Sequence, residues 1–105
     1  MNSEKISLLL CFKAQKGKKR DLVNHFTATA KLLTTNEEGT EIFTISTTPI
    51  DDDAVYVYEV YSSKETKELH ETGEAYNKAR ALMSEFVDGP PQVIPLIVQG
   101  GKGLK

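Results

Sequence analysis

Cysteine is almost absent from this chain, because Cys11 is the only one among its 105 residues. A single cysteine cannot form a disulfide within the chain. It lies in the apolar run 6–12, where we expect it to be buried as a small hydrophobic residue. That run is far too short to span a bilayer, Glu4 precedes it, and no small-residue cleavage site follows. We therefore expect a cytoplasmic protein without a signal peptide or a membrane segment.

The chain is also poor in residue patterns that build metal and nucleotide sites. Its two histidines, His25 and His70, fall on different predicted helices, and nothing has the spacing of a zinc site. The aspartates at 51–53 are consecutive, so they cannot all turn toward one cation as the ligands of a calcium loop do. The glycine-rich segment 100–103 leads into no helix, which excludes a phosphate-binding loop. The net charge of -2 gives no footprint for nucleic acid or for an anionic membrane.

Four segments have the composition of β-strands. The apolar run 6–12 suits a central strand that is covered on both faces. Segments 40–48 and 55–61 alternate and are rich in β-branched and aromatic residues, and a turn at 49–53 joins them into an antiparallel hairpin. The last strand is 93–98, whose proline requires an edge position or a bulge.

Two segments have helical periodicity. Apolar residues recur every three or four positions over residues 20–33 and form one stripe. The second helical segment begins at a predicted capping box of Ser62 and Glu65. Gly73 interrupts this segment, and the glycine and two prolines of 88–91 end it.

The resulting order is strand, helix, strand, strand, broken helix, strand. This is the βαββαβ pattern of a ferredoxin-like α+β fold, with a four-stranded antiparallel sheet and helices on one face. We expect one domain over residues 1–105, with a loose tail at 99–105. Apolar and aromatic residues occur on both faces of the strands, so the face away from the helices also needs a cover. A second copy of the sheet is the simplest cover, and we expect a homodimer.

Few side chains remain that could carry chemistry. His70 lies at the boundary of an apolar stripe, where a histidine is either a satisfied structural residue or a proton acceptor. Glu59 lies between Val57 and Tyr61 on one strand face, and a carboxylate in that position is costly unless it is paired. It is therefore either half of a structural ion pair or a catalytic acid. His25 flanks the first helical stripe, and we expect it to be exposed.

The tyrosines are candidates for the wall of an aromatic pocket. Tyr58, Tyr61 and Tyr76 can stack against a substrate or donate hydrogen bonds to it, although strand tyrosines are also common in cores. Strand alternation places Tyr58 and Tyr61 on opposite faces of the sheet, so at most one of them can line the pocket.

The order and spacing of several short motifs resemble the antibiotic biosynthesis monooxygenase domain family. These motifs are the acidic-Gly turn Glu38-Gly39, the strand end Glu59-x-Tyr61, the helical His70 and the stop at 89–91. The resemblance spans nearly the whole chain. It implies a dimeric α/β barrel, in which two ferredoxin-like subunits pack sheet to sheet.

Members of this family differ in activity, and the resemblance implies several alternatives. Some oxygenate phenolic or quinol compounds with dioxygen and no metal or flavin, some degrade haem, and some isomerise or bind small metabolites. The haem-degrading members use an asparagine, a tryptophan and a histidine. The matching places here hold Leu10, His70 and Arg80, and the chain has no tryptophan, so we do not expect haem.

These observations lead to one hypothesis and two alternatives. In the hypothesis, a small phenolic or quinol-type substrate stacks in an apolar pocket, His70 takes or shares its phenolic proton, and the anion reacts with dioxygen without a cofactor. Tyr58, Tyr61, Tyr76 and Glu59 are the candidate substrate-binding residues. The alternatives are a dimer that binds a small hydrophobic metabolite without catalysis, and an isomerase of a small keto-compound that uses His70 and Glu59 as acid and base.

Overall fold

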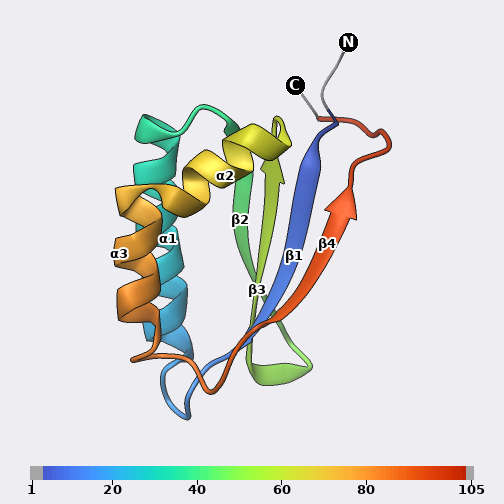
Figure 1. The fold of residues 1–105 in the computed structure, drawn as a ribbon. Coiled ribbons are helices and arrows are strands. Elements are labelled where there is room, and N and C mark those ends of the chain that lie inside the picture. Colours follow the sequence, from blue (N-terminus) through green and yellow to red (C-terminus); the bar gives the residue numbers. More distant parts are fainter. Residues whose placement is uncertain (1–3, 104–105) are drawn as a thin grey trace.

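A four-stranded antiparallel sheet with three helices on one face makes up the described part of the chain (Figure 1). The computed structural model describes residues 4–103, without the side chains of residues 35, 36 and 75. The elements follow in the order β1 Ile6–Lys13, α1 Lys19–Asn36, β2 Thr40–Thr48, β3 Asp51–Tyr61, α2 Lys64–Thr72, α3 Glu74–Met83 and β4 Gln92–Ile97. The strand order is β2-β3-β1-β4, so β1 is central as predicted. The predicted ferredoxin-like fold is confirmed.

The core lies between the sheet and α1. Val55 and Val57 of β3 and Phe12 of β1 point toward the helices, and Leu22 and Phe26 of α1 pack against them. The rings of Phe12 and Phe26 lie 4.8 Å apart between centroids. Burial of side chains of this size stabilises the fold by about 1.5–3 kcal/mol each. The stripe predicted for residues 20–33 thus holds α1 over β3, where it forms one wall of the site described next.

The hairpin between β2 and β3 differs from the prediction. The aspartates at 51–53 were expected in a turn, but β3 begins at Asp51, and only residues 49 and 50 lie outside the two strands. Asp51 forms an ion pair with Lys13 of β1, and the backbone N–H of Ala14 donates to the carbonyl of Asp53 at 2.8 Å. These contacts with the central strand extend β3 through residues that otherwise favour turns.

The helix after β3 begins one residue later than predicted. Ser63, not Ser62, is the N-cap, and its Oγ accepts a hydrogen bond from the backbone N–H of Thr66 at 3.2 Å. Thr66 Oγ1 accepts in return from the backbone N–H of Ser63 at 3.0 Å, in the place that was predicted for Glu65. Gly73 separates α2 from α3, as predicted.

No helix or strand of the described residues covers the sheet face away from the helices (Figure 1), although Ser7 and Val60 on this face are buried. We call it the open sheet face; it includes Leu9, Cys11, Tyr56, Tyr58, Ile94 and Leu96. Cys11 was expected to be buried, but it is half-buried there because it alternates with the helix-facing residues of β1. All six residues of β4 are exposed, including Pro95, which occupies the predicted edge position. Within residues 4–103, no helix is long and apolar enough to cross a membrane.

Candidate functional site

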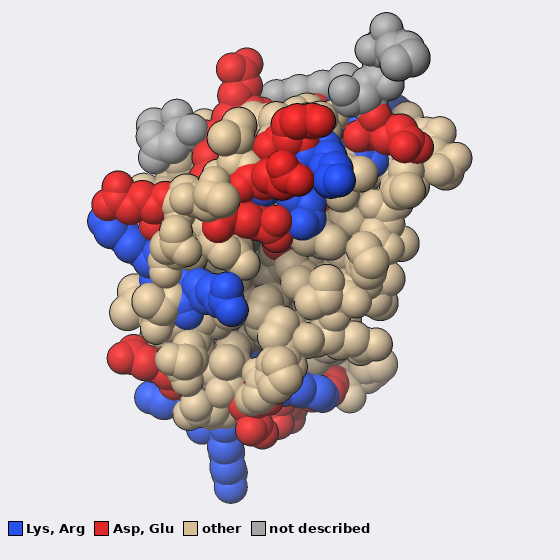
Figure 2. Space-filling model, in the orientation of Figure 1, with Lys and Arg blue, Asp and Glu red and all other residues tan. Residues whose placement is uncertain are grey.

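A cavity of about 330 Å³ lies between the helices and the sheet, and we call it the inner cavity. In Figure 2, the face between the helices and β4 is hollowed and mostly uncharged, and charged side chains gather over α2. The apolar lining comes from β1, α1, β2, β3, α3 and the segment that includes β4: Leu8, Leu10, Phe12, Phe26, Phe43, Val57, Met83, Pro91 and Val93. Such a lining suits a flat hydrophobic molecule.

His70 lies in the wall of this cavity, in the last turn of α2. Its side chain is buried, and its ring centroid lies 5.4 Å from that of Tyr61 and 5.2 Å from that of Tyr76. Its Nδ1 lies 2.5 Å from Oε1 of Glu37, which follows α1. Three elements therefore fix one imidazole ring at the cavity.

Glu59 and Tyr61 form a buried pair beside His70. They are two residues apart on β3, so both point toward the helices, and the Tyr61 hydroxyl donates a hydrogen bond to Oε1 of Glu59. Burial raises the pKa of Glu59 above its ordinary value, although the hydrogen bond from Tyr61 opposes this change. Burial and the negative charge of Glu59 raise the pKa of Tyr61, so its hydroxyl stays protonated and acts as a donor.

Replacing Glu59 by glutamine is expected to stabilise the protein increasingly as the pH rises. Because the pKa of Glu59 is higher in the folded state, the unfolded chain loses this proton first, and stability falls as the pH rises above the ordinary carboxyl value of 4.5. Glutamine keeps an acceptor for Tyr61 without the charge. Urea unfolding from pH 4.5 to 8 should show a growing difference between Glu59→Gln and wild type, reaching on the order of 1–2 kcal/mol.

The exposed Glu68 provides the matched control for this experiment, because Glu68→Gln removes the same charge without a change in burial. A constant difference between wild type and Glu59→Gln over the whole pH range would contradict the effect assigned to burial.

The predicted tyrosines divide as strand alternation required. Tyr61 and Tyr76 line the inner cavity together with Glu59 and His70. Tyr58 does not; it pairs with Leu9 on the open sheet face, so its assignment to the same pocket needs correction. Four of the five candidate residues are therefore brought together, and their roles in catalysis and binding stay predictions.

Other polar residues of the inner cavity were missed by sequence reasoning. His25 was expected to be exposed, but it is half-buried, and its Nε2 lies 2.9 Å from the carbonyl oxygen of Ala79 in α3. Arg80 lines the cavity as well, and Lys67 does so while paired with Glu71 at 2.9 Å. The family resemblance had matched Arg80 to a site position of the haem-degrading members, and its spacing from His70, about three helical turns, also places both on one side of the broken helix.

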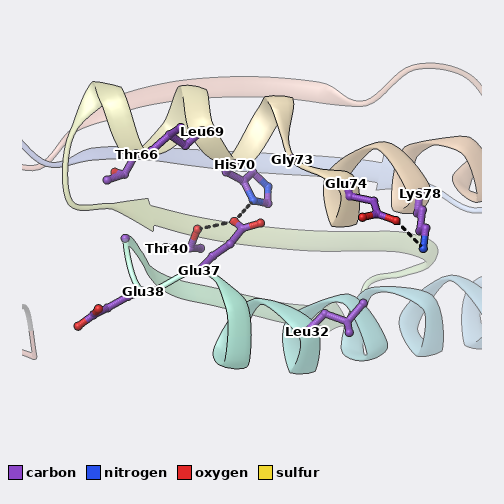
Figure 3. A pocket seen from close by; sticks show the side chains of 11 residues that line it. Leu32, Glu37, Glu38, Thr40, Thr66, Leu69, His70, Gly73, Glu74 and Lys78 are labelled. Carbon is purple, nitrogen blue, oxygen red and sulfur yellow. Dashed lines mark hydrogen bonds and ion pairs between the residues drawn. The ribbon is translucent and has the colours of Figure 1, made fainter.

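A second hollow of about 680 Å³ lies on the outer side of His70, and we call it the outer groove. Figure 3 shows it between the end of α1 and the helices α2 and α3, with Glu37 pointing at His70 and at Thr40. His70 lines both hollows, whereas Glu37 lines only the outer one.

Within the part of the chain that the structure describes, no three His, Cys, Asp or Glu side chains group closely enough to hold a metal ion.

Solved structures with the same fold come from several bacteria. A protein provisionally named as an antibiotic biosynthesis monooxygenase from Caulobacter crescentus is 20% identical, with a TM-score of 0.87 over 93% of this chain and 92% of that one. A second provisionally named member, from Chloroflexus aurantiacus, is 19% identical, with a TM-score of 0.84 over 96% and 99%. Rv0793 from Mycobacterium tuberculosis is 18% identical, with a TM-score of 0.82 over 94% and 99%. At these identities the likeness shows a common fold.

No curated protein sequence matched the chain. A family sequence model does match it, and this is stronger evidence of the family than the structural likeness. The sequence model of the family described as "Antibiotic biosynthesis monooxygenase" matches residues 6–82, which is most of the chain and runs from β1 nearly to the end of α3. Such a match supports a general monooxygenase-like function. The chain belongs to the antibiotic biosynthesis monooxygenase family.

Proposed function

We propose that this protein is a cofactor-independent monooxygenase that acts on a small phenolic or quinol-type aromatic molecule in the inner cavity. One observation carries the proposal: a buried histidine, His70, lies between Tyr61 and Tyr76 in the wall of an otherwise largely apolar cavity. The cavity volume of about 330 Å³ is in the range of sites for small molecules.

The proposed reaction begins with proton transfer to His70. Nε2 of His70 takes the proton of a substrate hydroxyl, and the resulting electron-rich anion reacts with dioxygen at a ring carbon. The substrate gains one oxygen atom and loses two hydrogens, which leave with the second oxygen atom as water; the proton held by His70 returns to that water. The apolar lining excludes solvent and orients the ring, and the protonated Tyr61 serves as a fixed wall residue.

Oxygen uptake tests this function directly. We expect the protein, freed of metal by chelation and of flavin by dialysis, to consume dioxygen with at least one member of a panel of quinols and anthrones, one molecule per substrate oxidised. Mass spectrometry with ¹⁸O₂ should place one labelled atom in the product. Uptake that depends on added flavin or metal would contradict cofactor independence, and a lack of uptake across the panel would contradict the substrate class.

An isomerase is the second candidate, and one observation favours it. Glu59 and His70 line the same cavity, and burial raises the pKa of Glu59, so this carboxyl holds its proton closer to neutral pH than an exposed one does. An acid and a base could then move a proton within a keto-compound. Product formation from such a compound under anaerobic conditions would favour this reading. Saturable binding without turnover in either assay would favour a non-catalytic binding protein.

We also propose that the protein is a homodimer formed through the open sheet face. Four aliphatic residues of β4, Val93, Ile94, Leu96 and Ile97, are 40–51% exposed, and a second sheet would cover those that face away from the helices. The free Cys11 thiol fits the reducing cytoplasm, where we propose that the protein works.

A further inference from the structure

The imidazole of His70 separates two hollows that both reach the protein surface. Its Nδ1 edge points to Glu37, which lines only the outer groove (Figure 3). The two tyrosines whose rings lie against the imidazole, Tyr61 and Tyr76, line the inner cavity. The opposite edge of the ring, which carries Nε2, therefore faces the inner cavity. Among the described residues, Nδ1 is the atom of this ring that has a hydrogen-bond partner.

The position of Glu37 is fixed from several sides. It is the C-cap of α1, and its backbone N–H donates to the carbonyl of Leu33 at 2.9 Å. Thr40 Oγ1 donates to the same Oε1 that faces His70, at 3.1 Å. The loop that follows lies against α2 so closely that a Cβ on Gly39 would lie 2.6 Å from Cγ2 of Thr66. Only a glycine allows this approach, and it holds the end of α1 beside α2.

Helix stability does not explain an acidic residue at this position. The C-terminal end of a helix carries partial negative charge, so a carboxylate there is unfavourable. The last turn of α1 also has no basic residue to offset it. The end of α2, in contrast, favours positive charge, and His70 lies in its last turn. The carboxylate of Glu37 thus has its favourable partner in His70 rather than in its own helix.

We propose that Glu37 is the positioning residue of His70 and determines which of its nitrogens can accept a proton. An ionised carboxylate only accepts hydrogen bonds, so Nδ1 must carry the hydrogen, and Nε2 is left free as the acceptor on the side of the inner cavity. When Nε2 takes the substrate proton, the carboxylate of Glu37 stabilises the imidazolium and the ring orientation. This inference rests on the proposed function for its catalytic consequence, but the tautomer can be measured without any substrate.

Because the outer groove is open, a small carboxylate from solvent can take the place of the Glu37 carboxylate beside His70. Its volume of about 680 Å³ lies directly behind Glu37 and His70. A small carboxylate such as formate can therefore reach Nδ1 when the Glu37 side chain is removed, while the substrate occupies the other side of the ring. Rescue of this kind requires an open route to the outer edge of the ring, and a purely structural role for Glu37 predicts no rescue.

The kinetic test compares three variants with a substrate that wild type oxidises. Glu37→Gln can rotate its amide and donate to Nδ1, so we expect kcat to fall about 10²-fold with little change in KM. Glu37→Ala should lose at least as much, and formate should restore at least about a tenth of the wild-type kcat in a saturable manner, whereas chloride at equal ionic strength should not. Glu38→Gln, an exposed neighbour, is the matched control and should keep wild-type activity.

The tautomer test uses ¹⁵N spectra of the histidine side chains. The chain has two histidines, so a spectrum of His25→Gln assigns the signals of His70. We expect protonated Nδ1 and unprotonated Nε2 in the neutral ring of wild type, and a shift toward protonated Nε2 in Glu37→Gln. An unchanged tautomer in Glu37→Gln overturns the proposal. If wild type oxidises no substrate, the proposed function fails while this spectrum still decides whether Glu37 sets the tautomer.

Discussion

Replacing His70 by glutamine is expected to lower kcat for a quinol or anthrone substrate by about 10²–10⁴-fold, the usual contribution of a positioned general base. Glutamine fills most of the space of the buried ring and can still donate a hydrogen bond to Glu37. It has no basic nitrogen, so it cannot take the substrate proton. Alanine is a poorer choice, because it would remove the ring that contacts Glu37, leaving only Thr40, and would join the inner cavity to the outer groove. Initial rates in an oxygen electrode, with thermal unfolding measured in parallel, check this prediction.

His25 provides the comparison for that experiment. It is the other histidine of the inner cavity, but its Nε2 is held by the carbonyl of Ala79, so its exchange for glutamine should change kcat by less than about tenfold. An equal loss in both variants would indicate that the shape of the cavity, and not a base at His70, determines the rate. Full oxygen uptake by His70→Gln would end the role assigned to His70.

Much of the fold could be predicted because local signals agreed with it. The apolar run of β1, the alternation of β2 and β3 and the break at Gly73 each depend on neighbouring residues, and the structure confirms all of them. Alternation also predicted correctly that Tyr58 and Tyr61 would face opposite ways. The order of the elements follows from these signals, and the ferredoxin-like topology follows from the order.

Two of the errors arise where a partner distant in sequence decides the outcome. The aspartates at 51–53 favour a turn locally, but Lys13, 38 residues before Asp51, supplies an ammonium group that holds Asp51 in the sheet. His25 lies off the apolar stripe of its own helix, yet α3 approaches that flank and supplies the carbonyl of Ala79. Burial of such residues depends on packing between helices, and the apolar periodicity of a single helix does not predict that packing.

Within the candidate site, the role of Glu37 could not be predicted from the sequence for the same reason. The sequence drew attention to Glu38-Gly39 as an acidic turn, but the residue before it is the one that contacts His70, which is 33 positions away. Two adjacent glutamates are equivalent in composition, and only the direction of the chain after α1 makes one of them face inward and the other outward. The motif therefore located the loop correctly and could not choose the side chain.

The largest expected effect on assembly comes from replacing Leu9 by lysine. Leu9 lies in the middle of the open sheet face, directly beside Tyr58 on one side and Ile94 on the other. In a two-fold symmetric dimer the substitution enters the interface twice, and each buried, unpaired ammonium costs several kcal/mol, so Kd should rise at least about 10³-fold. In a monomer the same lysine stays in water, and its stem covers the neighbouring apolar surface.

Sedimentation equilibrium distinguishes these states, since the chain has a mass of 11.7 kDa and the dimer has twice that mass. We expect wild type as a dimer and Leu9→Lys as a folded monomer at micromolar concentration. Ile50→Lys is the matched control. Ile50 is 92% exposed between β2 and β3, so this substitution introduces the same charge away from the sheet face. A dimer that survives Leu9→Lys would place the interface elsewhere, and a wild-type monomer would mean that the open sheet face needs a cover other than a second copy of the chain.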